Sequence, residues 1–360
     1  MTIIDARSIT SKRCGVRTVA LELFKRIDLS GEIIVILNKS YPIPVPKEIR
    51  VIEVSKFYSR FNPVGDLILG FKINKQFKGA NLITFHSWLP MFFHKPNKSS
   101  FILHDTFSLN DKEFFQGKGF IRAILSRLFF KVLTWVSVQR ATMIICPSEF
   151  TKKNAERLFP NFSKKFLIHR NGFIPEKTKH PKSTSKFKFF LYVGNFRSYK
   201  GFIQLAKAWS NIQDTIDYSL FVVGNDKKEK FEEIKSSYKL KNVIFWGQLS
   251  DEKLNTLFQQ SSGVIIPSIE EGFGIPIIDA VSKGLRVIAS DCDAHLEFGF
   301  KSPTYFNRHN HNMLSSLLIS FDPAIDHKVL QKDLEITEKY DWGIVAPKFW
   351  KTLNSEFNEA

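Results

Sequence analysis

Residues 263–291 read GVIIPSIEEGFGIPIIDAVSKGLRVIASD, and they combine an apolar run, a glycine turn, a helical pattern and a second apolar run. The runs 263–266 and 286–289 are short and rich in β-branched residues, which is typical of buried strands. Pro276 follows the Gly-Phe-Gly turn at a position suited to the first turn of a helix. The stretch therefore predicts a β-α-β unit with parallel strands.

The same alternation continues along the chain and predicts an α/β fold with mainly parallel sheets. The other expected strands are 33–37, 81–85, 100–103, 143–146, 189–193, 219–223 and 243–245. The polar, proline-containing segment 173–187 has the composition of a linker. We therefore expect two doubly wound domains, residues 1–172 and 188–340. Their ligand site is expected in the cleft between them, at the carboxyl ends of the strands.

The composition is that of a globular protein with room for two cores. The chain has 360 residues, of which 43% are hydrophobic and 24% are charged. The three cysteines, Cys14, Cys146 and Cys292, match no metal or disulfide spacing, which indicates a reducing compartment. Residues 1–7 lack the pattern of a signal peptide, and no uncharged apolar run reaches about 18 residues. We therefore expect a cytoplasmic protein.

The net charge of +17 is concentrated in the first half of the chain. Residues 1–172 contain 28 basic against 12 acidic residues, whereas the remainder contains 24 against 23. This asymmetry predicts that the first half faces an anionic partner, such as a membrane surface, a phosphorylated acceptor or nucleic acid. The apolar segment 118–140 carries one rough stripe of basic and small polar residues: Lys118, Arg122, Ser126, Lys131, Thr134 and Ser137.

Two interpretations of segment 118–140 are open. A basic amphipathic helix can lie in a membrane interface with its cations near lipid phosphates. An ordinary domain helix with a wide buried face has a similar pattern. The charge of the first half favours lipid contact.

The glycine turn at 272–274 stands among carboxylates. Gly272 and Gly274 allow the backbone to approach a ligand, and the N-terminus of the following helix can hold a phosphate. Glu271 would repel a phosphate, so a neutral polyhydroxyl group is expected beside it. Asp279, eight residues later, would lie about two helical turns on and on roughly the same face, where a carboxylate can bind both hydroxyls of a ribose.

This spacing predicts a sugar nucleotide, with the sugar at Glu271, the diphosphate at the glycines and the ribose at Asp279. The alternative is structural. Glu271 would then be the N-cap of the helix, and Asp279 a solvated helix residue.

The stretch from Glu271 to Asp279 resembles the acidic motif of the retaining glycosyltransferases of family 4, which have two Rossmann-like domains in the GT-B fold. The family motif is Glu, seven residues, Glu, so Asp279 is one methylene shorter than the usual residue. Residues 340–350 resemble the terminal helix that crosses back onto the first domain, which assigns that role to residues 341–360. Other segments resemble the family in the expected order: 4–7 with 15–18, 104–105, 147–150, 171–172, 192–201 and 245–251.

The resemblance implies catalytic roles for Glu271, His104 and Asp105. Glu271 would hold hydroxyls of the transferred sugar. His104 would touch the sugar or the reacting centre from the opposite domain, with a satisfied core histidine as the alternative. Asp105 would support its loop rather than act as a base. The implied donor-binding residues are Gly15, Gly194, Asn195, Arg197, Lys200, Gly247, Gly272, Phe273, Gly274 and Asp279.

Besides Asp279, the cationic residues of segment 192–201 also depart from the family pattern. The places that most often hold the family arginine are Asn195 and Tyr199, so Arg197 and Lys200 are the cationic candidates. Fixed cations and backbone amides would stabilise the negative charge of the departing nucleoside diphosphate. We identify no Asp-x-Asp pair suited to a bridging metal, so we expect neither a metal nor another cofactor.

The expected function is transfer of a hexose with retention of anomeric configuration. The donor would be a UDP- or GDP-sugar, with GDP-mannose among the candidates. The acceptor would be a glycan or lipid-linked molecule in cell-surface polysaccharide or lipopolysaccharide biosynthesis, at the inner face of the cytoplasmic membrane. The alternatives are a sugar-nucleotide epimerase or hydrolase on the same scaffold, and a non-catalytic sugar-nucleotide-binding scaffold protein. A nucleic-acid-binding protein is disfavoured, because the chain has no known recognition module for nucleic acid.

Overall fold

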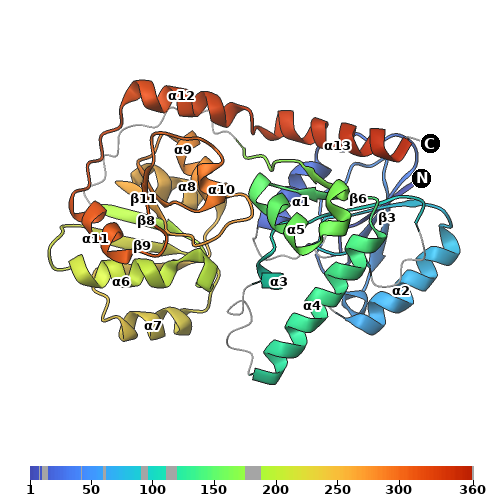
Figure 1. The fold of residues 1–360 in the computed structure, drawn as a ribbon, viewed down its shortest axis with the longest axis horizontal. Helices are drawn as coiled ribbons and strands as arrows, with labels where there is room; N and C mark the ends of the chain where they lie inside the picture. Colours follow the sequence, from blue (N-terminus) through green and yellow to red (C-terminus); the bar gives the residue numbers. More distant parts are fainter. Residues whose placement is uncertain are drawn as a thin grey trace. The chain divides into compact units, whose positions relative to one another are not determined.

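The protein consists of two compact units, which are described separately (Figure 1). The computed structural model describes residues 1–7, 9, 15–41, 43–59, 62–90, 96–110, 120–174 and 188–358. The first unit comprises residues 1–172 and 342–360, and the second comprises residues 173–341. Residues 175–187, most of the predicted linker, lie outside the described part of the chain.

In the first unit the described residues form a seven-stranded parallel sheet with the order β3-β2-β1-β4-β5-β6-β7. The four strands predicted in this half are confirmed to within one residue at each end. The strands are β1 (Thr2–Asp5), β2 (Ile33–Asn38), β3 (Arg50–Val54), β4 (Asn81–Thr84), β5 (Ser99–Ile102), β6 (Met143–Cys146) and β7 (Phe166–Ile168).

Helices cover both faces of this sheet, as expected for a doubly wound fold. One apolar core contains residues of α1 and α13, and the other contains residues of α2, α3, α4 and α5. The helix α13 comes from the end of the chain, and its Trp350 indole donates a hydrogen bond to the carbonyl of Leu23 at 3.1 Å. The helices are α1 (Gly15–Phe24), η1 (Lys56–Tyr58), α2 (Pro63–Gln76), α3 (Phe107–Asn110), α4 (Phe120–Arg140), α5 (Glu149–Leu158), η3 (Pro160–Lys165) and α13 (Trp342–Asn358).

A buried ionic cluster joins the end of β1, an interior strand of the sheet, to α2. The Arg7 guanidinium donates to both carboxylate oxygens of Asp5, at 2.8 and 2.7 Å, and to Asp66 Oδ1 at 2.7 Å. Its remaining nitrogen donates to the carbonyl of Tyr58 at 2.7 Å. Burial alone lowers the pKa of Arg7, but the two carboxylates raise it above its ordinary value. The cluster therefore places a guanidinium between two carboxyl groups in the interior.

The helix predicted from segment 118–140 is present as α4, but the expected polar face is only partly present: Lys131 is exposed and Ser126 is half-buried, whereas its two other described members are not exposed. Thr134 and Ser137 are buried, and the Ser137 hydroxyl donates to Leu133 O at 2.7 Å while it accepts from Leu89 N at 2.9 Å. Local backbone groups therefore satisfy this polar side chain inside the unit. Lys118 lies outside the described part of the chain, and the Arg122 side chain is not described. The exposed side chains of the outer face are mainly apolar, with Lys131 among them. The apolar ones are Ile124, Leu125, Leu128, Val132 and Trp135.

In the second unit the described residues form a six-stranded parallel sheet with the order β10-β9-β8-β11-β12-β13. The five strands predicted in this half are confirmed, although β10 runs two residues further and β12 begins and ends one residue later than expected. The strands are β8 (Phe189–Val193), β9 (Ser219–Val223), β10 (Val243–Gly247), β11 (Gly263–Ile266), β12 (Val287–Ser290) and β13 (Thr304–Phe306).

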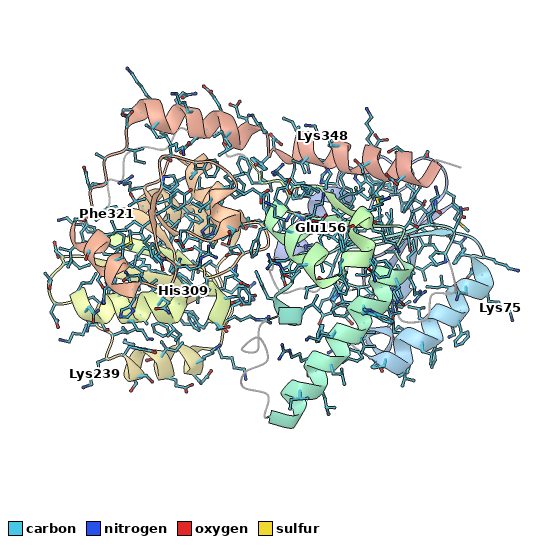
Figure 2. All side chains as sticks on the ribbon, viewed as in Figure 1. Lys75, Glu156, Lys239, His309, Phe321 and Lys348 are labelled. Atoms are coloured by element: carbon cyan, nitrogen blue, oxygen red, sulfur yellow. The ribbon has the colours of Figure 1, made fainter. Side chains whose placement is uncertain are left out.

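Helices also cover both faces of the second sheet. The core on one face contains residues of α6, α7 and α11, and Phe321 (labelled in Figure 2) packs there against Phe190 with ring centroids 4.7 Å apart. The core on the other face contains residues of α8 and α9. The helices are η4 (Ser198–Lys200), α6 (Phe202–Ile212), α7 (Lys228–Ser237), α8 (Asp251–Gln260), α9 (Ile275–Ser282), α10 (Asp293–Leu296), α11 (His311–Ile319) and α12 (His327–Glu338).

Each strand order reverses direction once. In the second unit the reversal falls between β8 and β11, which are neighbours in the sheet although two strands separate them in the chain. The segments that follow these two strands leave in opposite directions, so a crevice opens at their carboxyl ends. Ligands of doubly wound sheets bind at such a point.

Candidate functional site

A buried ion pair lies at the reversal point of the second sheet. Lys200 belongs to η4, in the segment after β8, and Glu271 follows β11. The Lys200 ammonium contacts both carboxylate oxygens of Glu271, Oε1 at 2.7 Å and Oε2 at 2.9 Å. Glu271 is only 6% exposed, whereas the Lys200 side chain is 20% exposed. The structure thus joins two of the predicted site residues, 71 positions apart in the chain.

Close backbone contact holds the segment around Lys200 and the segment before Glu271 together. Gly201 has a φ of 68°, and a Cβ at this position would lie 1.8 Å from the carbonyl oxygen of Pro267. Only glycine fits there. The carbonyl of Tyr199 accepts hydrogen bonds from the amides of Ile269 at 2.8 Å and Glu270 at 3.3 Å. Lys200 and Glu271 are therefore positioned by the backbone on either side of them.

The ion pair keeps the carboxyl of Glu271 ionised. Burial raises the pKa of Glu271, but the Lys200 ammonium and the hydrogen bonds from Lys200 and Ser268 lower it by more, so the net pKa lies below its ordinary value. A group whose folded-state pKa is lowered stabilises the fold above its unfolded-state pKa and loses this effect as the pH falls through the folded-state pKa. The pair is therefore intact at neutral pH.

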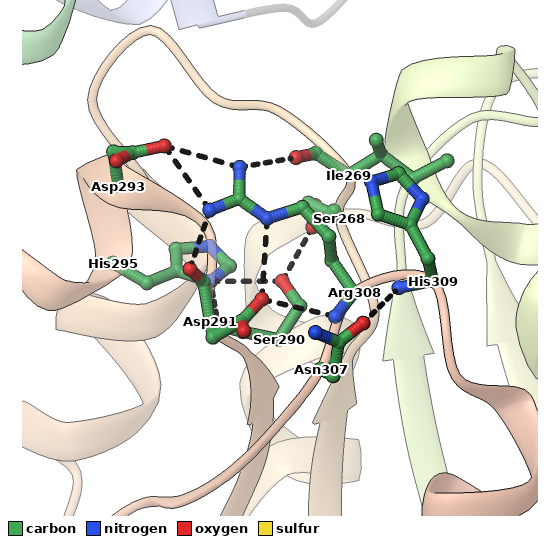
Figure 3. A network of polar contacts seen from close by, with 9 residues as sticks. All are labelled: Ser268, Ile269, Ser290, Asp291, Asp293, His295, Asn307, Arg308 and His309. Atoms are coloured by element: carbon green, nitrogen blue, oxygen red, sulfur yellow. Dashed lines mark hydrogen bonds and ion pairs between the residues drawn. The ribbon is translucent and has the colours of Figure 1, made fainter.

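A chain of hydroxyl groups supports Glu271, and Figure 3 shows its members Ser268 and Ser290 together with His295. The Ser268 hydroxyl donates to Glu271 Oε1 at 2.6 Å, and the Ser290 hydroxyl donates to the carbonyl of Ser268. His295 is fully buried, and its Nδ1 lies 3.0 Å from the carbonyl oxygen of Ser290. The sequence analysis did not identify these supports. Ser268 lies three residues before Glu271, but Ser290 and His295 come from β12 and α10, and no spacing in the chain connects these two with Glu271.

Arg308 fixes the same loop from another side (Figure 3). Its Nη1 donates to the carbonyl of Ile269 at 3.3 Å, and its other nitrogens contact Asp291 at 3.1 and 2.7 Å and Asp293 at 3.1 Å. Asp291 and Asp293 form an Asp-x-Asp pair that the sequence analysis did not single out, and here both bind a guanidinium. Among the described residues no group of three or more His, Cys, Asp or Glu side chains is arranged to hold a metal ion.

Glycines end three neighbouring strands of the second sheet. Gly194 follows β8, Gly224 follows β9 and Gly247 ends β10. The amide of Gly194 donates to the carbonyl of Val223, and the amide of Gly224 donates to that of Gly247. A Cβ on Gly224 would lie 2.2 Å from the carbonyl oxygen of Gly194. Gly194 and Gly247 were predicted as donor-binding residues, and Gly224 was missed.

Asn195 and Arg197 shape the turn between Gly194 and Lys200. The side-chain oxygen of Asn195 accepts a hydrogen bond from the amide of Arg197 at 3.2 Å. The backbone carbonyl of Asn195 accepts one from the Tyr192 hydroxyl at 2.8 Å. Arg197 is exposed and is the N-cap residue of η4. Donor binding by Asn195 and Arg197 stays a prediction.

The glycine turn at 272–274 leads into α9 as expected, but one detail of the prediction and one of its structural alternative are wrong. The N-cap residue is Gly274, with a φ of 97°, so Glu271 does not cap the helix. Because α9 begins at Ile275, Glu271 and Asp279 do not share a helix face. The Phe273 side chain packs on Phe298, with ring centroids 5.1 Å apart, and so only its backbone faces the turn.

Asp279 pairs with a buried lysine. The Lys283 ammonium lies 2.5 Å from Asp279 Oδ1, and the two side chains are 3% and 29% exposed. Asp279 is therefore not the solvated helix residue of the structural alternative. No hydrogen bond to Asp279 Oδ2 exists within the described ranges, and this oxygen keeps its acceptor capacity.

The predicted residues of the first unit lie at the carboxyl end of its sheet. His104 follows β5, and its Nε2 lies 2.8 Å from the carbonyl oxygen of Phe85, so Nε2 carries the hydrogen. Burial lowers the pKa of His104 to about 4, which keeps the imidazole neutral. Asp105 accepts a hydrogen bond from the amide of Phe107 at 3.1 Å and so supports the start of α3. Gly15 is the first residue of α1 and is exposed.

Residues 173–298 match the family model described as glycosyl transferases group 1. Over 196 residues the chain is 26% identical to the O-antigen chain mannosyltransferase RfbU of Salmonella typhimurium. This alignment covers 51% of the chain and 52% of RfbU, so the chain spans about half the length of this curated relative.

Two solved structures resemble the whole chain. One is WaaG, a glycosyltransferase involved in lipopolysaccharide biosynthesis, with a TM-score of 0.73, 15% identity and coverage of 98% of this chain and 99% of WaaG. The other is Anabaena HepE in complex with UDP-glucose, with a TM-score of 0.69, 14% identity and coverage of 98% and 99%. These matches confirm the predicted α/β fold class, which is GT-B.

Proposed function

We propose that the chain transfers a hexose from a nucleotide-diphosphate sugar to a glycan or lipid-linked acceptor, because residues 173–298 match the family model of glycosyl transferases group 1. The observation that supports this most is the Lys200–Glu271 pair at the reversal point of the second sheet. RfbU is a mannosyltransferase, which makes GDP-mannose a candidate donor, and the HepE structure contains UDP-glucose, which makes UDP-sugars candidates as well.

In the proposed mechanism Lys200 leaves Glu271 for the diphosphate of the donor. There the ammonium and the amides of the glycine turn stabilise the charge that grows on the departing group. Glu271, which Ser268 holds in place, accepts hydrogen bonds from sugar hydroxyls. Asp279 Oδ2 accepts from a ribose hydroxyl while Oδ1 stays on Lys283.

Three parts of the proposal rest on the family resemblance. They are retention of configuration, independence of metal ions, and the roles of His104 and Asp105. His104 and Glu271 belong to different units, and their joint action stays a prediction.

The first experiment is a thermal-shift screen with UDP-glucose, GDP-mannose and other UDP-, GDP- and dTDP-sugars. A nucleotide sugar at 100 times its dissociation constant stabilises the folded protein by about 2.7 kcal/mol. We expect at least one of these compounds to raise the melting temperature of the wild type and to leave that of Lys200→Met nearly unchanged. If none of them raises it at millimolar concentration, the proposed donor site does not exist.

A second measurement separates transfer from the enzymatic alternatives. An epimerase changes the bound sugar without any acceptor, and a hydrolase releases it to water. For the transferase we expect the donor to stay intact until a glycan or lipid-linked acceptor is added. Rapid epimerisation or hydrolysis of the donor alone would favour the alternatives.

We further propose that the first unit binds an anionic membrane surface through α4. Ile124, Leu125, Leu128, Val132 and Trp135 are each at least 50% exposed, and at about 100° per residue they form one stripe of the helix. On α2 the exposed side chains Val64, Ile68 and Phe71 add apolar surface (Figure 2 shows the side chains of both helices). The positive charge of residues 1–172 complements anionic lipid.

The contact would be interfacial. Within the described ranges no helix is long and apolar enough to cross a membrane. An amphipathic helix lies in the headgroup region with its apolar face toward the acyl chains, and electrostatic attraction adds to its binding. The proposed location is therefore the inner face of the cytoplasmic membrane.

Co-sedimentation with vesicles tests this surface. We expect the protein to bind phosphatidylcholine vesicles that contain phosphatidylglycerol and to be released by salt, because salt screens exposed charges. Replacing Leu125 and Leu128 together by serine should weaken binding by about tenfold or more, since apolar area no longer leaves water. The matched control replaces Met313 and Ile319, which are exposed on α11, by serine. This double substitution should not change vesicle binding. Equal binding of both double variants would contradict the proposal.

A further inference from the structure

His295 has one nitrogen that the fold leaves without a hydrogen bond. The side chain is fully buried, Nδ1 faces the carbonyl and hydroxyl of Ser290 at 3.0 and 3.3 Å, and Nε2 has no partner among the described residues. A carbonyl oxygen only accepts, so the hydrogen is on Nδ1. In the neutral ring Nε2 is therefore a buried lone pair.

The ring lies between the two parts of the candidate site. A Cβ on Gly274, the N-cap of α9, would lie 3.2 Å from His295 Cδ2. In the other direction the ring is linked through Ser290 and Ser268 to Glu271 Oε1. The imidazole thus contacts the glycine turn and is connected to the acid by hydrogen bonds.

The charged groups that face His295 are Glu271, Lys200 and Arg308. Burial lowers the pKa of His295, and Glu271 raises it by less, so the net pKa lies below its ordinary value and the ring is neutral in the free protein. Lys200 balances Glu271 there, and Arg308 is bound to Asp291 and Asp293. In the free protein Lys200 already compensates the charge of Glu271, so a positive charge on His295 would bring no further stabilisation.

This balance changes in the proposed donor complex. If Lys200 turns to the diphosphate, the Glu271 carboxylate stays buried without its counter-charge, and the ligand adds two negative charges nearby. A buried charge is costly unless another charge compensates it. Protonation of Nε2 supplies a positive charge beside Glu271 and breaks no existing hydrogen bond.

We infer that His295 is a positioning residue that takes up one proton from solvent when a nucleotide-diphosphate sugar binds, so that the imidazolium replaces Lys200 as the counter-charge of Glu271. The inference rests on the proposed function and deepens it. It also has a consequence with a definite sign. Because the complex binds more protons than the free protein, donor affinity falls as the pH rises, by up to about tenfold per pH unit where the uptake is complete.

Isothermal titration calorimetry tests the proton uptake. UDP-glucose and GDP-mannose are the probes, because their diphosphates carry no group that titrates near neutral pH. Each is titrated at the same pH in Pipes and in Tris, which differ in ionisation enthalpy. For the wild type we expect the apparent binding enthalpy to differ between the buffers by an amount that corresponds to between about half a proton and one proton taken up.

Two variants make the test specific. His295→Gln keeps an amide that can donate to the carbonyl of Ser290 but does not titrate, so we expect it to fold, to bind the donor without proton uptake and to lose the pH dependence of its affinity. His309→Gln is the matched control, because His309 is an exposed histidine beside the same network (Figure 3), and it should behave like the wild type.

The possible failures are distinguishable. Donor binding by the wild type without proton uptake, or equal uptake by His295→Gln, would overturn the inference and leave the proposed function in place. If no nucleotide sugar binds the wild type, the proposed function fails, and the inference fails with it.

Discussion

Replacement of Arg7 by methionine is expected to lower the free energy of unfolding of the first unit by about 3–5 kcal/mol. The guanidinium makes two hydrogen bonds to Asp5 and one to Asp66, and all three side chains are at most 3% exposed. Methionine fills much of the same volume but leaves two carboxylates facing each other in the interior. Since a typical domain is stable by about 5–15 kcal/mol, the change removes a large share of that stability.

The loss should depend on pH with a definite sign. In the variant the crowded carboxyls favour protonation in the folded state more than in the unfolded state. The folded variant therefore binds more protons, and the penalty should be smaller at pH 5 than at pH 7.5. The wild type should not recover stability in this way on acidification.

Hydrogen exchange at the amides of β1 and α2 in increasing urea measures the stability of the first unit by itself. The matched control is Arg26→Met. Arg26 lies just after α1 and pairs with Glu22 at 2.6 Å, and the two side chains are 33% and 5% exposed. Glu22 keeps Lys25 as a partner, so this loss should stay below about 1 kcal/mol. Similar losses in the two variants would show that the buried cluster is not a major source of stability.

Replacement of Lys200 by methionine is expected to slow sugar transfer by about a hundredfold or more, which corresponds to about 3 kcal/mol of transition-state stabilisation. In the proposed mechanism the ammonium meets the charge that develops on the departing diphosphate. Methionine keeps the length of the side chain and removes the charge. The defect should appear in kcat and in kcat/KM, because the contact strengthens in the transition state.

The Lys200 variant also leaves Glu271 buried without its partner. Glu271→Gln in the same chain removes the unpaired charge, so the double variant should be more stable than Lys200→Met alone while remaining inactive. Lys241→Met is the control, because Lys241 forms an exposed ion pair with Asp214 in the same unit and should leave transfer unchanged. Transfer by Lys200→Met within about threefold of the wild type would rule out the proposed role of this lysine.

The strands could be predicted from the sequence because their signal is local. Runs such as 189–193 and 263–266 are apolar and β-branched or aromatic throughout, and only a strand buried on both faces has that composition. The order of the strands within each sheet was not predicted, because doubly wound sheets occur in more than one order. The family resemblance placed Lys200 and Glu271 in the same site, but it did not predict that they form an ion pair.

The errors have a common physical origin, since a linear pattern does not state which neighbours a residue meets. Segment 118–140 has helical periodicity, but its sequence does not show that Ser137 finds backbone partners inside the unit while Leu125 stays exposed. The face shared by Glu271 and Asp279 assumed a helix that in fact begins at Ile275. His295 and Arg308 join the site through the ends of β12 and β13, and this proximity exists only in the folded unit.

The first unit is assembled from both ends of the chain, and this has a consequence for synthesis on the ribosome. Its core includes Trp342, Phe349 and Trp350 of α13, which are translated after the whole second unit. Domains usually fold in the order in which they emerge. Here the unit that begins first is completed only after the whole second unit has been translated. Until then the nascent protein exposes the apolar surface that α13 covers in the folded unit, and a chaperone could bind this surface.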